Sequence, residues 1–385
     1  MPVTKIASTT FPNIAIVDVL GKGKGVIAKE DISRGTLIVS EKPRITLPRH
    51  PSQSTNTLSN LSREDSLFLL SFPCGPDEHP IFGRRKHFTP CVGDDAVGSG
   101  LCPTICRVNH TCYSPKGRPN AAYFWNVNSK HEELWAIKEI QAGQEIEVSY
   151  MEDIENYQNP LVLLRQKFGF QCSCPGCARS AAEQTESERR IRAYNDFVRD
   201  LPSRFGPESP LEILRDIETQ VLIICEEGYT GEVGARAHDA FQLCAYYGDA
   251  DSAKKWEAIC RDCHALYHGR SESFEKARRL AAKPQDFRAW GQLGRRKLRG
   301  PSKQVLEYCY PETQMMTNAT PSGIGSSSSA VALTPQAVVE GTPTIVAPAA
   351  ISHAISTAGK LSKGQKKNAK AKAKKEAAKL ATQRD

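Results

Sequence analysis

Residues 11–150 alternate short apolar runs with turn residues, a pattern typical of a β-rich domain. Strands are predicted at residues 14–17, 19–20, 26–28, 36–39, 134–137 and 145–150. In the last of these strands Ile146, Val148 and Tyr150 would share one face, because side chains alternate along a strand. Residues 58–70 predict a single helix between the strands.

From about residue 185 the spacing of apolar residues changes to three and four, which is typical of helices. One apolar stripe consists of Leu211, Leu214, Ile217 and Val221, and a second of Trp256, Ile259, Cys260, Cys263 and Tyr267. Asp249 or Asp251 would cap the helix that carries the second stripe. We predict four or five helices in antiparallel pairs, as a bundle or a short solenoid.

The end of the chain has a different composition. Residues 311–359 contain no Lys or Arg and are rich in Ser, Thr, Pro and Ala, so they bury too little apolar surface to fold. Residues 360–385 carry ten Lys or Arg and two Asp or Glu, and this excess of +8 equals the net charge of the whole chain. We therefore predict a disordered linker and Lys-rich tail over residues 311–385. The tail either keeps the protein soluble, directs nuclear import or contacts nucleic acid.

Composition also narrows the class of protein and its compartment. With 39% apolar and 24% charged residues, the chain has an ordinary globular mix. No run approaches the ~18 apolar residues of a membrane span, and no secretory signal is recognisable at the N-terminus. The thirteen cysteines are therefore expected to be thiols or metal ligands in a reducing compartment, the nucleus and/or the cytoplasm.

Three of these cysteines form the strongest local signal. Cys172, Cys174 and Cys177 lie within six residues, where disulfides among them would need strained geometry. A tetrahedral zinc ion accepts such thiolates at about 2.3 Å, with a fourth ligand supplied from elsewhere in the chain. The alternative is three unpaired thiols on a Pro-Gly turn, which is less favoured because exposed thiols are reactive.

Two further motifs are ambiguous when taken alone. The sequence Asn109-His110-Thr-Cys112 fits a thiol nucleophile with its histidine, but a hydrogen-bonded structural histidine is the default interpretation. The GKGKG run at residues 21–25 lacks the spacing of a dinucleotide-binding loop. It predicts a tight turn that allows a close approach to the backbone.

The other cysteines favour structural roles. Cys260, Cys263 and His264 match a haem-attachment pattern, but both cysteines lie on the apolar stripe of a helix, so core packing is preferred. Among Cys74, Cys91, Cys102, Cys106, His79 and His87 no C-x-x-C pair repeats. A second zinc site among them is therefore not favoured.

Taken in order, four motifs resemble those of the SET-domain protein lysine methyltransferases. They are residues 23–28 (GKGVIA), the signature over residues 107–121 with Asn109-His110 and Pro119-Asn120-Ala121, residues 143–150 (GQEIEVSY) and the post-SET zinc segment at 168–177 (FGFQCSCPGC). The layout is most similar to the SET-and-MYND group and related fungal SET proteins, without a MYND finger.

The resemblance implies an α+β fold in which a β-rich SET domain precedes an all-α helical domain. The expected parts are a SET domain at residues 11–152 with a helical insert at about 45–100, a post-SET zinc segment at 160–180 and the helical domain at 185–305. A protein substrate with a target lysine, on a histone or another protein, would be the partner. Chromatin or nucleic acid would contact the Lys-rich tail, and no membrane is involved.

The same resemblance assigns roles to individual residues. S-adenosyl-L-methionine would be the methyl donor, bound by Lys24, Gly25, Asn109, His110, Tyr150 and Phe170. Tyr150 would be the catalytic residue, with Phe168, Phe170 and Tyr123 as candidate walls of the lysine channel. Structural zinc would be held by Cys112 together with Cys172, Cys174 and Cys177.

The chain departs from the family pattern at one place. Six residues, 113–118, separate Cys112 from Pro119, where the family has a single residue. Pro115 and Gly117 would allow this segment to loop out without disturbing the site. Displacement of Asn120 would instead favour an inactive SET scaffold that binds chromatin or protein partners.

Overall fold

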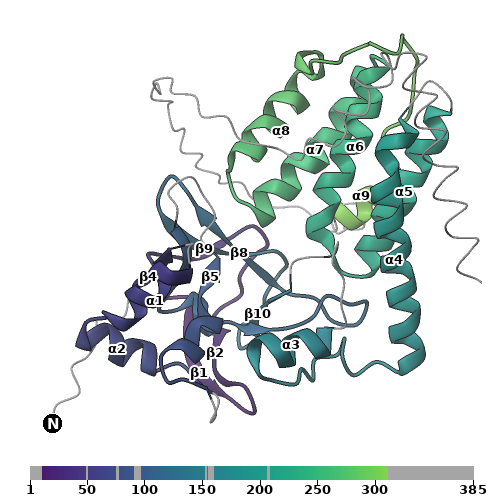
Figure 1. The fold of residues 1–385 in the computed structure, drawn as a ribbon. Coiled ribbons are helices and arrows are strands. Elements are labelled where there is room, and N and C mark those ends of the chain that lie inside the picture. The colour runs from purple at the N-terminus through teal and green to yellow at the C-terminus, as the bar shows by residue number, and fades with distance from the viewer. Residues whose placement is uncertain are drawn as a thin grey trace, which may run out of the picture.

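The computed structural model describes residues 11–48, 51–74, 78–90, 97–151, 154, 160–205 and 209–310. Strands fill the N-terminal part and helices the C-terminal part, which confirms the predicted α+β class (Figure 1). The predicted linker and tail at 311–385 lie outside the described residues. Within the described part of the chain, no helix combines the length and apolarity that a membrane crossing requires.

The first sheet has four strands in the order β1 (Ile14–Val19), β2 (Gly23–Ala28), β10 (Glu145–Val148) and β7 (Asn109–His110). Strands β1 and β2 form an antiparallel hairpin, and Gly21 and Gly23 at its turn have positive φ angles of 75° and 77°. Strand β10 runs parallel to β7, with Glu147 opposite Asn109 and Val148 opposite His110. This pairing brings two of the sequence motifs side by side.

Two smaller sheets complete the β-rich part. The second has the order β3 (Leu37–Glu41), β9 (His131–Ala136) and β8 (Ala121–Asn126), and the third the order β4 (Ile45–Pro48), β6 (Val97–Leu101) and β5 (Thr89–Pro90). The first two sheets share one core, in which Val26, Leu134 and Ile146 are fully buried. Ile146 and Val148 share one face of β10, as predicted, and both are buried.

The insert differs from its prediction. The single helix expected over residues 58–70 is wrong, because two helices, α1 (Pro51–Ser59) and α2 (Arg63–Leu70), occupy this region. Ser62 begins the second helix as its N-cap, and its side chain accepts a hydrogen bond from the Asp65 N–H at 3.0 Å. The insert also supplies the third sheet and the 3₁₀ helix η1 (Phe82–His87), so it is not purely helical.

A short helix, α3 (Pro160–Phe168), and the cysteine segment lead into the helical part. Its helices are α4 (Ala181–Arg204), α5 (Pro210–Glu226), α6 (Val233–Tyr246), α7 (Ala250–Tyr267), α8 (Glu272–Ala282) and α9 (Lys303–Cys309). Asp249 is the N-cap of α7, which confirms one of the two predicted alternatives. The stripe on α5 is buried at Leu214, Ile217 and Val221, but the prediction is wrong for Leu211, which is exposed.

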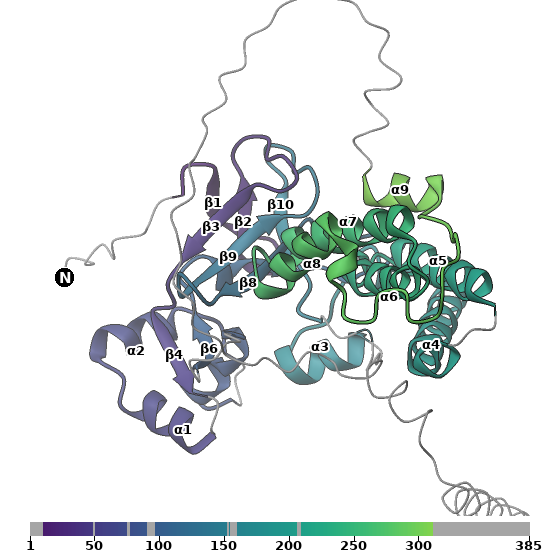
Figure 2. The ribbon, with the colours of Figure 1, turned by 90° about the horizontal axis from the view of Figure 1, so that it is seen from above.

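The helical part packs against the β-rich part at several points (Figure 2). Helix α7 contacts β8 and β9, and Gly269 just beyond it leaves room for the ring of Phe124. An added Cβ at Gly269 would lie 2.0 Å from that ring. Arg34 donates a hydrogen bond to the Cys309 carbonyl at the end of α9, with the two atoms 3.2 Å apart.

Candidate active site and metal centre

Tyr150 is held at both its backbone and its phenol. It lies two residues beyond the end of β10, which is shorter than the strand predicted over residues 145–150, and its N–H donates to Nδ1 of His110 at 2.9 Å. Its hydroxyl donates to the Val108 carbonyl at 2.7 Å. Burial raises the pKa of Tyr150, so the phenol stays protonated throughout the neutral range. The residue is fixed in place as a neutral dipole and hydrogen-bond donor.

The His110 ring connects Tyr150 to the cysteines. Because Nδ1 accepts the Tyr150 N–H, the ring proton must be on Nε2. Nε2 lies 3.1 Å from the Cys112 sulfur, to which it donates. Both ring nitrogens are therefore used within the protein, in line with the default interpretation of a structural histidine. Only the His110 backbone remains available for any ligand.

Aromatic rings surround Tyr150 on the side of the cysteine segment. The ring centroid of Phe168 lies 5.0 Å from that of Tyr150, and that of Phe170 lies 6.4 Å away. Phe170 also lies 6.1 Å from the His110 ring. Tyr123 packs against the same hydrophobic core as Tyr150. The structure thus brings the two phenylalanines proposed for the channel wall to the tyrosine proposed for catalysis.

The glycine run on β2 lies close to the signature motif on β7, and a side chain of the motif is hydrogen-bonded to it. Nδ2 of Asn109 donates to the Lys24 carbonyl at 3.2 Å and to Oε1 of Glu145 at 2.8 Å. A Cβ at Gly25 would lie 2.6 Å from Val19 and 2.8 Å from the Asn109 amide. We expected Gly25 to let a ligand approach the backbone closely. In the structure the neighbouring protein side chains already leave no room for a Cβ at this position. The Lys24 side chain points to the surface, where it pairs with Asp18 at 2.7 Å.

Sequence reasoning missed Glu145 as a member of this group. It accepts hydrogen bonds from Asn109 and from Lys22, whose Nζ lies 2.8 Å from Oε2. Its position on the polar face of the predicted last strand, beside Glu147, was the signal available in the sequence. Lys22 pairs with Glu147 as well, at 2.7 Å.

Asn120, which follows the six residues 113–118, is bonded to β10 through both ends of its amide. Its Nδ2 donates to the Glu145 carbonyl and its Oδ1 accepts the Glu147 N–H, both at 2.8 Å. The side chain is buried, so these bonds satisfy it away from water. The added residues therefore leave Asn120 buried and hydrogen-bonded to β10.

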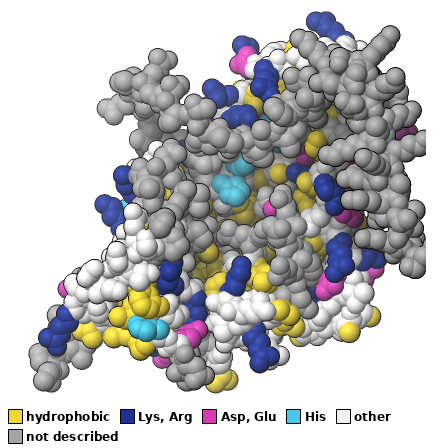
Figure 3. All heavy atoms as spheres, in the orientation of Figure 1, with side chains coloured by type: hydrophobic (Ala, Val, Ile, Leu, Met, Phe, Trp, Pro, Cys, Tyr) yellow, Lys and Arg dark blue, Asp and Glu magenta, His cyan; other side chains and the backbone are white. Residues whose placement is uncertain are grey.

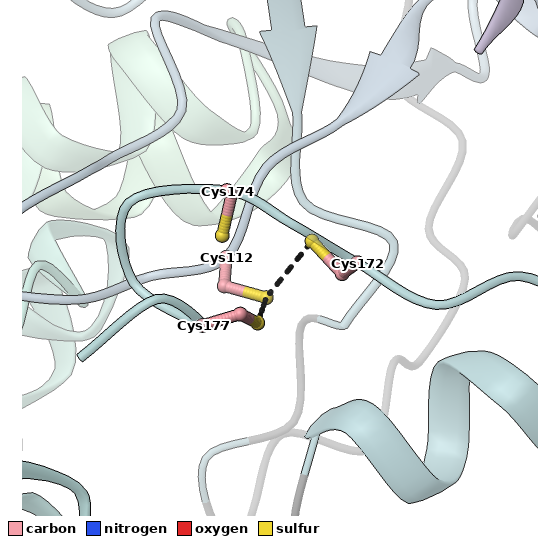
Figure 4. Close-up of side chains that lie close together, drawn as sticks. All are labelled: Cys112, Cys172, Cys174 and Cys177. Atoms are coloured by element: carbon pink, nitrogen blue, oxygen red, sulfur yellow. Dashed lines mark hydrogen bonds between the residues drawn. The ribbon is translucent and has the colours of Figure 1, made fainter. Parts of the chain in front are cut away.

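Four cysteine sulfurs converge beside His110 (Figure 4). Sγ of Cys112 lies 4.0 Å from that of Cys172 and 3.5 Å from that of Cys177, and Cys174 completes a group within 4.8 Å. Tetrahedral zinc with sulfurs at about 2.3 Å separates them by about 3.8 Å, so the spacing fits this metal. The pKa of Cys172 and that of Cys174 are both lowered, the latter to about 5. The largest cause in each case is a hydrogen bond with Cys112. Part of the cluster thus favours the thiolate form that binds metal.

A second group of possible metal ligands has a structural explanation. His238, Glu257 and Cys260 offer ligand atoms within 4.8 Å of one another. Nδ1 of His238 already lies 2.9 Å from the buried Glu257 carboxylate, and Cys260 belongs to the helical core. Cys263 packs against that core as well, which bears out core packing over haem attachment.

The β-rich part of the chain is a SET domain. A family model of that description matches residues 23–151, which run from the start of β2 to just beyond Tyr150. The matched region contains Asn109, His110, Cys112 and Tyr150, and Cys172, Cys174 and Cys177 follow it after α3.

Several curated proteins are similar to this chain. Histone-lysine N-methyltransferase set5 of Schizosaccharomyces pombe is 28% identical over 276 residues, which are 70% of this chain and 83% of that protein. Histone-lysine N-methyltransferase SMYD3 of Mus musculus is 32% identical over 128 residues, 32% of this chain and 28% of that protein. N-lysine methyltransferase SMYD2 of Gallus gallus is 28% identical over 100 residues, 26% of this chain and 21% of that protein.

The match to the yeast relative extends over most of that protein, whereas the matches to the SMYD proteins span less than a third of their length. The chain therefore contains a SET domain and is similar to histone-lysine methyltransferases.

Proposed function

We propose that this protein is a protein-lysine N-methyltransferase that uses S-adenosyl-L-methionine. The proposal rests on the position of Tyr150 near the end of a SET-domain strand. Hydrogen bonds to His110 and to the Val108 carbonyl hold its backbone and its phenol in place. Histone lysines are the first substrates to test, because the yeast relative and SMYD3 are named as histone-lysine N-methyltransferases. Lysines of other proteins are the second.

The residues around β2 and β7 would bind the methyl donor. The backbone of Lys24 and Gly25, ordered by the Asn109 amide, would lie along it, and the His110 backbone would contribute hydrogen bonds. Phe170, half-buried beside His110, would cover it from the cysteine segment. When bound, S-adenosyl-L-methionine supplies a methyl group on a positively charged sulfur, open to in-line displacement by an amine.

The protein's own contribution is to align the lysine and to lower its pKa, so that the ammonium group releases its proton to water before the amine attacks. A free lysine has a pKa of about 10.4, so its attacking nitrogen must lose a proton first. The aromatic surroundings of Phe168 and Tyr150 lower that pKa, since burial disfavours the charged amine. The Tyr150 phenol stays protonated and is not the base; it orients the nitrogen as a fixed dipole.

The four-cysteine centre would hold one structural zinc ion. Cys112 comes from the SET signature, whereas Cys172, Cys174 and Cys177 follow α3. One ion would therefore fasten the segment carrying Phe168 and Phe170 next to Tyr150. The hydrophobic cluster in this segment is small, so metal coordination would supply much of its order.

An inactive scaffold is the alternative that the insertion after Cys112 raised. The buried Asn120, bonded to β10 on both sides of its amide, favours an intact site instead. Calorimetric titration of the zinc-loaded protein with S-adenosylhomocysteine tests the choice. One-to-one binding is expected for the enzyme, and absence of binding by the folded, zinc-loaded protein would favour the scaffold.

The Lys-rich tail is proposed to contact nucleic acid or chromatin and to support a nuclear as well as a cytoplasmic location. Residues 360–385 carry an excess of +8, which equals the net charge of the whole chain. On the face in Figure 3, by contrast, Lys and Arg side chains are interspersed with acidic ones. Removal of residues 360–385 should abolish DNA binding, and binding by the full chain should fall steeply with salt. DNA binding that survives the truncation would contradict this role.

A further inference from the structure

The loop at residues 113–118 has both ends fixed in the β-rich part. It leaves Cys112, which belongs to the four-cysteine centre, and returns to Asn120, which is bonded to β10. Ser114 is fully buried within the loop, and its hydroxyl donates to the Gly117 carbonyl and accepts the Gly117 N–H, both at 2.9 Å. The loop is therefore a closed turn whose position depends on where Cys112 is held.

One side of this loop lies on the end of α5. The Tyr113 ring centroid is 4.7 Å from that of Tyr229, and the Arg118 guanidinium donates to the Glu226 carbonyl at 3.4 Å. Gly228 lies so close that a Cβ there would be 3.1 Å from the Ser114 nitrogen and 3.2 Å from its oxygen. The backbone of Gly228 and the backbone of Ser114 are therefore in close contact, so the loop packs tightly against the helical part.

The other side of the loop lies on the cysteine segment and the start of α4. A Cβ at Gly176 would lie 2.7 Å from the Ser114 hydroxyl, and one at Gly117 would lie 3.4 Å from Pro175. Lys116 pairs with Glu183 at 2.7 Å, and Glu183 also forms the capping box at the start of α4. The loop thus contacts the metal segment, α4 and α5 at once.

We propose that residues 113–118 are a strut that positions the helical part on the SET domain, and that the strut is in place only while the four cysteines hold their metal. This inference rests on the proposed zinc centre but not on methyl transfer. Loss of the metal frees Cys112 and the segment around Pro175 together, which removes the support of the loop on two sides. The end of α5 and the residues Gly228 and Tyr229 that follow it then lose their contact with the loop.

Hydrogen exchange measured by mass spectrometry on the full chain, with and without chelator, tests the coupling. Chelation should speed exchange at residues 223–232 by about tenfold or more, which corresponds to roughly 1.4 kcal/mol of local opening free energy. Residues 252–262, in the buried half of α7, serve as the internal control and should not change. Opening of residues 172–177 with no change at 223–232 would overturn the proposal, as would native protein that carries no metal.

Variants separate the strut from the metal itself. Deletion of residues 114–118 leaves Tyr113 alone between Cys112 and Pro119; the variant should keep its metal but exchange at 223–232 as fast as the chelated protein does. If that deletion does not fold, the double variant Tyr113→Ala, Arg118→Ala gives the same test. Arg215→Ala, at an exposed position of α5, is the matched control. Metal-loaded strut variants with unchanged exchange at 223–232 would overturn the proposal.

Methyl transfer is not a readout of these experiments, so the two proposals fail separately. A protein with coupled exchange but no methyltransferase activity would refute the proposed function and leave the strut. A protein that methylates lysine while its exchange is uncoupled would refute the strut alone.

Discussion

The backbone N–H of Tyr150 donates to Nδ1 of His110 at 2.9 Å, although forty residues separate the two in sequence. The same ring donates through Nε2 to the Cys112 sulfur at 3.1 Å. One imidazole therefore fixes the tyrosine proposed for catalysis and a cysteine proposed for zinc. This bond to a metal ligand is the kind that orients the ligand and tunes its affinity for the metal.

His110→Asn should disturb both partners of the ring. We expect zinc affinity to fall about 10–100-fold, because the hydrogen bond to the ligand sulfur is lost. Turnover should fall as well, since Tyr150 loses its backbone anchor. Competition with a chromophoric chelator measures the affinity, and saturating zinc distinguishes the two effects. Full recovery of turnover at saturating zinc would show that His110 does not position Tyr150.

Tyr150→Phe removes only the phenol oxygen and its bond to the Val108 carbonyl. We expect kcat to fall about 10²–10³-fold, as for loss of one preorganised polar group at a reacting centre. Binding of S-adenosylhomocysteine should change little. Tyr308→Phe, in α9 and remote from the site, is the matched control. A kcat equal to that of the wild type would exclude Tyr150 from catalysis.

Cys174→Ser should lower zinc content and activity together, because three thiolates bind zinc far less tightly than four. Elemental analysis of the purified variant gives the metal stoichiometry. Cys74→Ser is the control, since Cys74 contacts Glu78 and lies outside the four-cysteine group. A full zinc complement in Cys174→Ser would contradict the assignment of Cys174 as a ligand.

Gly25→Ala should weaken S-adenosylhomocysteine binding roughly tenfold, because the new methyl group collides with Val19 and the Asn109 amide. Lys24→Ala is the comparison at the neighbouring position. Its side chain reaches only the exposed Asp18, so binding should be nearly unchanged. The reverse order of effects, measured by calorimetry, would mean that the lysine side chain and not the backbone binds the donor.

Acid should destabilise the protein through His264. Burial first, and then the charges of His268, His238 and Lys276, lower the pKa of His264 from 6.5 to about 4. Between these two pH values the unfolded chain binds a proton that the folded chain does not, so stability falls as pH falls through this window. His264→Gln should remove roughly 1–2 kcal/mol of that loss, a value reduced for partial exposure. Equal pH dependence of unfolding in both proteins would contradict the shift.

Local patterns in the sequence predict part of this structure. Alternation marked the strand with Ile146 and Val148, and thiol spacing marked Cys172, Cys174 and Cys177 as a group. The break at Ser62 was missed because the apolar pattern continues through it, while a single capping hydrogen bond decides where the second helix begins. The spacing of apolar residues does not show where a capping hydrogen bond will start a new helix.

Contacts between distant segments could not be predicted from the sequence. The two bonds of the His110 ring depend on the parallel pairing of β7 with β10, which no local pattern encodes. The position of the loop before Asn120 likewise depends on contacts with Gly228 and Tyr229, more than a hundred residues later. Sequence alone left displacement of Asn120 open, and only the fold shows where the added residues go.

The most direct test of the central claim is methyl transfer itself. Zinc-loaded protein is incubated with S-adenosylmethionine carrying a deuterated methyl group and with core histones, and the histones are then examined by mass spectrometry. We predict deuterated methyl groups on lysine with the wild type and at least about a hundredfold less with Tyr150→Phe. If the wild-type protein binds the donor yet labels no lysine on histones or on the proteins of a cell extract, it is not a lysine methyltransferase.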